Sequence, residues 1–254
     1  MTIAYKTIGA GPQRVVALHD WTTPSQTFDG IHPVLDTDTF TYAFVDLRGY
    51  GASKGIKGEY TSKEAARDVI EVADELGWAK FHIAGHSMSG MIAQRVNLDF
   101  PKRVISMVAI TPVPASGVPV DDEGRALFTG AASDPEKWRM VAGMLTADRL
   151  PEAWYKMKHK LFEASVDKDA FLGFFDMWTG ENFADRLRDM QTPALALLGE
   201  HDFQMFTEES MRQTLGQCYP DLKIITLPNA AHYPMAETPL SFVKEMEDFM
   251  REAA

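Results

Sequence analysis

The chain has 254 residues, 45% of them hydrophobic, which is enough to bury a large core in one domain spanning residues 1–254. Its formal net charge of −11 argues against binding nucleic acid, which requires a basic face. No apolar run approaches the roughly 18 residues of a membrane span, and the first residues do not follow the pattern of a signal peptide. The single cysteine, Cys218, cannot form an internal disulfide, so we expect a cytoplasmic protein without membrane contact.

Metal and cofactor motifs are not found in the sequence. The seven histidines lack the His-X-His and His-Glu-X-X-His spacings of zinc sites, and one cysteine cannot supply Cys-X-X-Cys. Neither the glycine-rich turn of dinucleotide-binding folds nor a P-loop occurs. We therefore expect no metal, no cofactor and a small-molecule substrate. The oligomeric state is left open, a homodimer included.

Short runs rich in β-branched and aromatic residues predict seven strands, several of them apolar throughout, as in strands covered on both faces. They span residues 3–8, 14–19, 40–45, 80–84, 104–110, 194–199 and 222–227. Helical patterns lie between them: residues 61–77 begin with a capping-box spacing and end at Gly77, and residues 88–100 and 239–251 predict two more helices. This alternation favours an α/β fold with a mostly parallel, doubly wound sheet.

The alternation stops between about residues 112 and 189. A stretch containing proline and glycine leads into helical sequence rich in Trp, Phe and Met, without a strand signal. We expect a helical lid, residues 114–185, inserted within the domain. A small cap has few places to hide so much apolar surface, so some of these aromatic side chains should face the substrate. The tryptophans expected to line the pocket are Trp138, Trp154 and Trp178.

The sequence Gly85-His86-Ser87-Met88-Ser89 follows a predicted strand and precedes a predicted helix. A sharp strand-to-helix turn holds a serine hydroxyl in the open and aims the first helical amides at a developing oxyanion. Such a turn requires small residues two positions before and after the serine. Gly85 meets this need, and Ser89 replaces the usual glycine with another small residue. The context therefore favours Ser87 as a nucleophile.

A serine nucleophile needs a base, and the base needs an acid that orients it. Asp202 follows the predicted strand 194–199, and His232 follows the strand 222–227. The carboxyl ends of parallel strands face one crevice, so Ser87, Asp202 and His232 can converge there. Glu200 is the alternative acid, but we favour Asp202. The order Ser, Asp, His along the chain is typical of one hydrolase arrangement.

Six segments in this order resemble the α/β-hydrolase superfamily over nearly the whole chain. They are His19-Asp20-Trp21, residues 46–53 (DLRGYGAS), residues 85–89 (GHSMS), residues 101–104 (PKRV), residues 199–202 (GEHD) and residues 231–239 (AHYPMAETP). The combination is specific for the fold and much less specific for the substrate.

The resemblance implies that Ser87 is the nucleophile, His232 the general base and then acid, and Asp202 the residue that orients His232. It also implies an oxyanion hole formed by the backbone amides of Met88 and Trp21, with the Trp21 side chain lining the pocket. The sequence departs from the family pattern at Asp20, where glycine is usual, and this places a carboxylate near an anion site. We expect His19 and His86 to have structural roles.

The resemblance favours a serine hydrolase that cleaves a carboxylic ester or lactone through an acyl-enzyme. A carbon–carbon bond hydrolase with the same triad is the main alternative. A cofactor-free dioxygenase of the quinolone type is a weaker one, because its supporting acid follows the strand after the elbow, where this chain reads Ala-Ile-Thr-Pro-Val-Pro. A signalling receptor that hydrolyses its ligand slowly is a further alternative.

Overall fold

The computed structural model describes residues 2–254, which form a seven-stranded sheet in the order β1-β3-β2-β4-β5-β6-β7. All neighbouring strands are parallel except β1, which pairs antiparallel with β3. The predicted mostly parallel α/β sheet is therefore confirmed. The strands are β1 (Tyr5–Gly9), β2 (Gln13–Leu18), β3 (Phe40–Val45), β4 (Phe81–His86), β5 (Val104–Ile110), β6 (Ala194–Gly199) and β7 (Lys223–Leu227).

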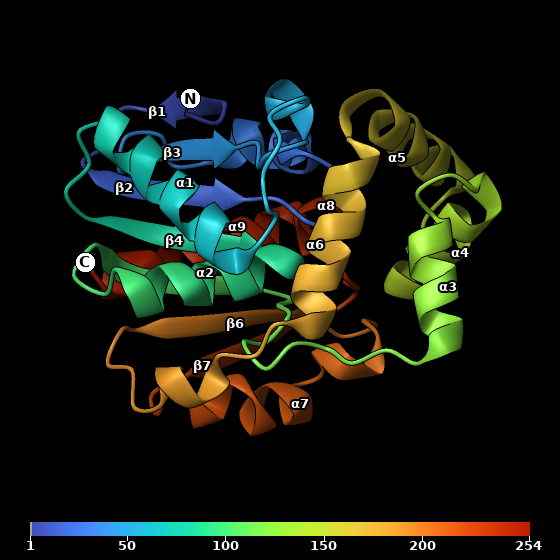
Figure 1. The fold of residues 1–254 in the computed structure, drawn as a ribbon. Helices are drawn as coiled ribbons and strands as arrows, with labels where there is room; N and C mark the ends of the chain where they lie inside the picture. Colours follow the sequence, from blue (N-terminus) through green and yellow to red (C-terminus); the bar gives the residue numbers. More distant parts are fainter. Residues whose placement is uncertain (1) are drawn as a thin grey trace.

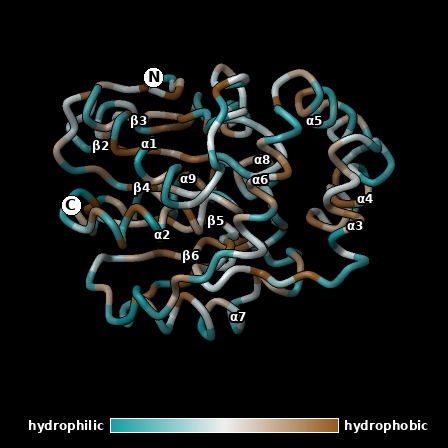
Figure 2. Tube along the Cα trace, viewed as in Figure 1, coloured by the Kyte–Doolittle hydropathy of each residue, from teal (hydrophilic) through white to brown (hydrophobic). Residues whose placement is uncertain are grey.

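The central strands are apolar on both sides because helices cover both faces of the sheet. Every residue of β3, β4 and β6 is buried. In β2, Val16 and Leu18 pack into one hydrophobic cluster, while Val15 and Ala17 pack into the cluster on the opposite face. This division follows the two-residue repeat of a strand. Figure 2 shows the brown, hydrophobic strands inside a more hydrophilic outer layer.

Two helices, α1 (Ser62–Glu75) and α2 (Met88–Asp99), cover one face. The 3₁₀ segment η1 (Ser25–Val34), the short helix α8 (Pro234–Glu237) and α9 (Pro239–Glu252) lie on the other (Figure 1). Helix α1 begins where predicted, because the Thr61 side chain accepts a hydrogen bond from the Glu64 amide. No helix within residues 2–254 is long and apolar enough to cross a membrane.

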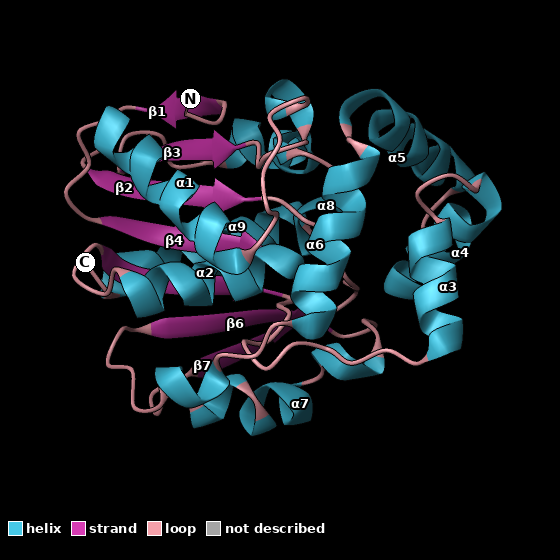
Figure 3. Cartoon of the chain, viewed as in Figure 1, coloured by secondary structure: helices cyan, strands magenta, loops and turns pink. Residues whose placement is uncertain are grey.

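A helical insertion separates β5 from β6 (Figure 3). Its elements are α3 (Asp122–Gly130), α4 (Pro135–Thr146), α5 (Glu152–Ser165), α6 (Lys168–Gly180) and the 3₁₀ segment η3 (Ala184–Leu187). Asp121 and Asp134 cap α3 and α4 by accepting backbone hydrogen bonds at their amino termini. Figure 1 shows the insertion beside the carboxyl ends of the parallel strands, with α6 nearest to them. The helices therefore lie at the edge of the sheet where the predicted site residues are found.

Candidate active site

Ser87 lies on a tight turn between β4 and α2. Its φ of +57° and ψ of −118° are strained for a residue with a side chain. The turn is closed by backbone hydrogen bonds from the Ser87 amide to Ile110 and from the Gly90 amide to Ser87, both 2.9 Å long. A Cβ atom on Gly85 would come within 2.2 Å of the Ser89 carbonyl oxygen, so only glycine fits there. This geometry presents the serine hydroxyl at the carboxyl edge of the sheet.

Ser89, which replaces the usual glycine, contributes a hydrogen bond of its own. Its hydroxyl donates to the His19 carbonyl oxygen at 2.5 Å. His19 in turn accepts a hydrogen bond from the Leu47 amide on Nε2, so its Nδ1–H donates to the Asp20 carbonyl oxygen. These contacts join the start of α2 to the loop after β2. They support the structural role expected for His19.

Ser87, His232 and Asp202 form one hydrogen-bonded line. The His232 Nε2 atom lies 2.8 Å from Ser87 Oγ, and its Nδ1 atom lies 2.9 Å from Asp202 Oδ2. The side chains of His232 and Asp202 are both 1% exposed. Burial raises the pKa of Asp202, and the His232 ring opposes this effect. With the proton on Nδ1, His232 can accept the Ser87 proton on Nε2.

Glu200, the alternative acid, points elsewhere. Its carboxylate accepts a hydrogen bond from the Asn229 amide at 2.9 Å and lies 3.5 Å from His201 at the surface. Asp202 accepts a further hydrogen bond from the Phe203 amide at 2.7 Å, which fixes its carboxylate toward His232. The structure therefore brings Asp202, and not Glu200, to the histidine.

The two residues expected to supply the oxyanion donors, Met88 and Trp21, line the same cavity as Ser87. Met88 is the first residue of α2, where the helix presents free amides. Trp21 follows β2 and is anchored at both ends: its indole Nε1–H donates to the Phe171 carbonyl oxygen at 2.7 Å, and its own carbonyl accepts from the Tyr50 hydroxyl at 2.8 Å. Within residues 2–254, the Met88 and Trp21 backbone amides donate no hydrogen bond.

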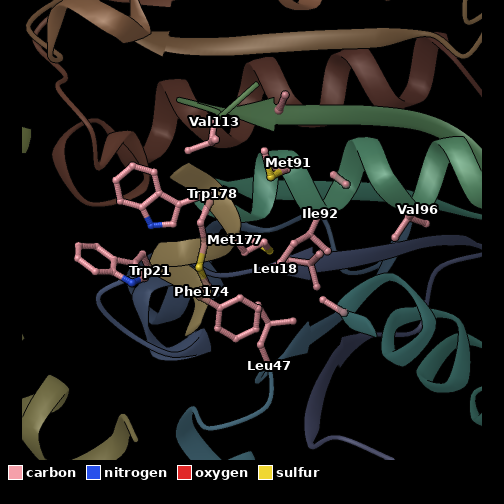
Figure 4. Packing of buried hydrophobic residues seen from close by; sticks show 14 of the residues in the cluster. Leu18, Trp21, Leu47, Met91, Ile92, Val96, Val113, Phe174, Met177 and Trp178 are labelled. Carbon is pink, nitrogen blue, oxygen red and sulfur yellow. The ribbon is translucent and has the colours of Figure 1, made fainter. Parts of the chain in front are cut away.

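Ser87 opens into an apolar cavity of about 310 Å³ beneath the helical insertion. Trp21 and Trp178 stand next to each other in its wall, with ring centroids 5.6 Å apart, as Figure 4 shows. Among the described residues that line the cavity, Asp121 is the one that carries a charge. The cavity is lined by Trp21, Ser87, Met88, Val113, Pro119, Val120, Asp121, Gly124, Phe128, Val141, Met144, Leu145, Trp178, Phe203, Met205 and Phe206.

Trp138 and Trp154, which were expected in the pocket, are not among these residues. Trp138 is two turns before Leu145 in α4, about 10 Å along the helix, and packs inside the insertion against His159 and Phe162. Trp154 packs against the Tyr233 ring behind the histidine loop. Trp138 is on the same face of α4 as Leu145, so its absence from the lining depends on how far along the helix the cavity extends. The place of Trp154 depends on how α5 packs, and a composition argument reveals neither position.

The sequence analysis missed the apolar residues that follow Asp202. Phe206 packs against the His232 ring at 4.6 Å between centroids, and Phe203 and Met205 line the cavity beside it. It also missed Phe128, Met144 and Leu145 from the insertion. The available signal was that three of the four residues after a candidate acid are apolar, at the carboxyl edge of a sheet where solvent would otherwise be expected.

Two buried histidines of β4, His82 near its amino end and His86 at its carboxyl end, predict sensitivity to acid. Burial lowers the pKa of His82 to about 4 and that of His86 to about 3. In the unfolded chain each histidine has a pKa of about 6.5. Below that pH the unfolded chain therefore binds protons that the folded chain does not bind. We expect each to lower the free energy of unfolding by at most about 1.4 kcal/mol per pH unit between pH 6 and pH 4.5.

Urea unfolding at pH 7, 6 and 5 measures this effect. His82→Asn is the matched variant, since His82 contacts Ser106 and lies away from the cavity. Its stability should depend less steeply on pH than that of the wild type. An equal pH dependence of the two proteins would contradict the assignment of a neutral, buried His82.

A doubly covered parallel sheet, a serine on a strand-to-helix turn, and a histidine and aspartate after later strands define the α/β-hydrolase class of protein. The chain belongs to the alpha/beta hydrolase family, to which residues 15–245 match. The resemblance stated from the sequence motifs is thereby confirmed.

Relatives within this family have several activities. The chain is 27% identical to a pimeloyl-[acyl-carrier protein] methyl ester esterase of Klebsiella pneumoniae, over 96% of each chain. It is 24% identical to a 2-hydroxy-6-oxononadienedioate/2-hydroxy-6-oxononatrienedioate hydrolase of Paraburkholderia phymatum, over 98% of this chain and 91% of the relative. Among solved structures, an esterase from Exiguobacterium antarcticum superposes with a TM-score of 0.87 at 22% identity, over 98% and 95% of the two chains.

Proposed function

We propose that this protein is a serine hydrolase that cleaves carboxylic esters or lactones of small apolar or aromatic compounds. The observation that carries the proposal is the unbroken line from Asp202 through His232 to Ser87, with Ser87 at the wall of an apolar cavity. Esterases among the relatives support the reaction class, because the methyl ester esterase aligns with nearly the whole chain.

In this mechanism His232 Nε2 takes the proton of the Ser87 hydroxyl as Oγ attacks the substrate carbonyl. The tetrahedral intermediate places its negative oxygen between the Met88 and Trp21 amides, each contributing roughly 3 kcal/mol to stabilising the transition state. His232 then protonates the leaving alkoxide, and the acyl group stays on Ser87. Water, deprotonated by His232, attacks the acyl-enzyme and releases the acid.

The cavity favours an uncharged substrate. Aromatic, aliphatic and methionine side chains make up most of its wall, and the described lining contains Asp121 but no lysine or arginine. A substrate with two carboxylates, such as the dioate named for the Paraburkholderia relative, would have to enter without a positive partner. We therefore rank ester or lactone cleavage above carbon–carbon bond cleavage. A spectral assay with a vinylogous diketone substrate separates the two reactions.

The acyl-chain preference tests the proposal. With p-nitrophenyl esters of graded length, kcat/KM should rise by about fourfold per methylene, equivalent to about 0.8 kcal/mol, until the cavity is full. Trp178→Ala removes part of the cavity wall and should move the optimum to longer acyl groups. Trp138→Ala is the matched control, because Trp138 packs inside the insertion and should leave the optimum unchanged.

Purified protein, a lactone panel and the same ester series suffice for the measurement. A wild type that turns over no ester or lactone would contradict the proposed function. An identical acyl-length profile in Trp178→Ala and the wild type would contradict the proposed pocket. The cytoplasmic location stays a prediction, which cell fractionation tests.

A further inference from the structure

Asp20, the departure from the family pattern, is buried beneath the loop that carries Trp21. Its side chain is 1% exposed, and both carboxylate oxygens accept hydrogen bonds from the two residues after Trp21. The Thr22 amide donates at 2.7 Å and the Thr23 amide at 3.2 Å, while the Thr22 and Thr23 hydroxyls donate at 2.5 and 2.8 Å. Asp20 therefore folds residues 20–23 around its own carboxylate, with the Trp21 amide inside that turn.

A buried carboxylate needs a positive partner, and the helical insertion supplies it. Lys158 of α5 is 4% exposed, and its Nζ atom donates to Thr23 Oγ1 at 2.7 Å and to Thr27 Oγ1 at 3.1 Å. Burial alone would raise the pKa of Asp20, but the positive charge of Lys158, the His86 ring 3.8 Å away and the Thr22 hydroxyl hold that pKa below its usual value. Burial lowers the pKa of Lys158, and Asp20 opposes this effect.

Thr23 connects the two charges. Its hydroxyl accepts a hydrogen bond from Lys158 and donates its one proton to Asp20. The hydroxyl therefore acts as acceptor on one side and as donor on the other. A hydroxyl held in this way cannot rotate without losing a bond to a buried charge. The Thr23 side chain, and the backbone that leads to Trp21, are therefore tied to the position of α5.

The same group of charges also contacts the histidine loop. The Lys158 ammonium lies 4.7 Å above the Tyr233 ring, and the Tyr233 hydroxyl lies 2.9 Å from Thr22 Oγ1. Neither Asp20 nor Lys158 lines the cavity beside Ser87, so neither is placed to touch substrate. Any effect of these two residues on the reaction would be exerted through the loop after β2 and the loop that carries His232.

We propose that Lys158 and Asp20, joined through Thr23, are positioning residues that set the Trp21 amide in the oxyanion hole. The helical insertion thus completes the catalytic apparatus of the sheet domain as well as covering it. The inference rests on the proposed function, because it assigns these residues to the stabilisation of the oxyanion formed at Ser87.

Thr23→Val is the sharpest test, since it keeps both charges and the side-chain shape and removes only the hydroxyl between them. With p-nitrophenyl butyrate, we expect kcat per active site to fall by about 10- to 100-fold, approaching the loss of one oxyanion donor, with KM changed less than about threefold. Titration with a fluorophosphonate gives the number of active sites, so that unfolded protein does not lower the apparent rate.

A transition-state analogue provides the second measurement. An alkyl trifluoromethyl ketone forms a hemiketal with a serine, and the charged oxygen of this adduct occupies the oxyanion hole. Its inhibition constant should rise in Thr23→Val by about the factor by which kcat/KM falls. A purely structural role would change the melting temperature without this parallel loss.

Three further variants test whether the effect arises from the hydrogen bonds that join Lys158 to Asp20 through Thr23. Lys158→Met should lose kcat in the same way, and Thr27→Val should lose less than Thr23→Val, since Thr27 contacts Lys158 but not Asp20. Lys156→Met is the matched control on the exposed side of α5 and should behave as the wild type. If Lys158→Met fails to fold, the kcat of Thr23→Val still tests the inference.

A kcat of Thr23→Val within about twofold of the wild type, a change confined to KM, or equal losses in Thr23→Val and Thr27→Val would overturn the inference. These outcomes require an active wild type, so they leave the proposed function intact. A wild type without ester or lactone hydrolysis refutes the proposed function and the inference together.

Discussion

Replacement of Ser87 by alanine is expected to lower kcat for an activated ester by at least about 10⁵-fold, because the Ser87 hydroxyl is the nucleophilic group bonded to His232 Nε2. The side chain is small and 9% exposed, and the strained turn is closed by backbone hydrogen bonds that alanine retains. The variant should therefore fold with nearly the stability of the wild type. Steady-state hydrolysis of p-nitrophenyl butyrate and thermal unfolding measure the two properties.

Covalent labelling identifies the nucleophile independently. Mass spectrometry after fluorophosphonate treatment should find one adduct, on Ser87, and none in Ser87→Ala. Ser116→Ala is the control, since Ser116 follows β5 but does not line the cavity. An adduct on another serine, or a residual rate above about a hundredth of the wild-type rate, would refute the covalent mechanism.

Replacement of Asp202 by asparagine is expected to lower kcat by about 10³- to 10⁴-fold, less than the loss of Ser87. The asparagine amide can donate to His232 Nδ1, which moves the ring proton to Nε2 and leaves no acceptor for the Ser87 proton. The variant also lacks the negative charge that stabilises the imidazolium. The steady-state rate, measured at several pH values, tests the expectation.

Glu200→Gln is the matched variant for this second prediction. Glu200 is half exposed, bonds to the Asn229 amide and does not reach His232, so its removal should leave kcat near the wild-type value. Greater damage from Glu200→Gln than from Asp202→Asn would show that Glu200 is the acid. Because the two residues belong to the same loop, the comparison also controls for loop disturbance.

The sheet could be predicted from the sequence because its strands carry a strong local signal. β3, β5 and β6 have the predicted bounds, and the other strands differ by one or two residues. Segments without a repeating pattern were not predicted. The 3₁₀ stretch η1 contains Pro33 and has no side-chain capping hydrogen bond at its start, yet it packs on the sheet through Phe28 and Ile31. Its conformation depends on the surface it covers.

The residues of the candidate triad could be located because each follows the end of a strand, and topology brings strand ends together. Most of the cavity wall could not, since it depends on how four inserted helices turn toward the sheet. Lys158 illustrates the limit. In sequence it stands next to two other lysines and a histidine on an amphipathic helix, a pattern typical of a surface charge. The packing of α5 on the loop after β2 buries it.

The helical insertion is bonded to the loops of the candidate active site at several points. The Leu145 carbonyl accepts from the His232 amide at 3.2 Å, the Phe171 carbonyl accepts from the Trp21 indole, and Lys158 bonds to Thr23. Moving the insertion away as a rigid body would break all three contacts. Met144 and Phe203, 39% and 41% exposed, line the cavity and also face solvent. The cavity therefore reaches the surface beside these two residues, and replacing the insertion with that of a relative would remove contacts of the candidate active site as well as part of the cavity wall.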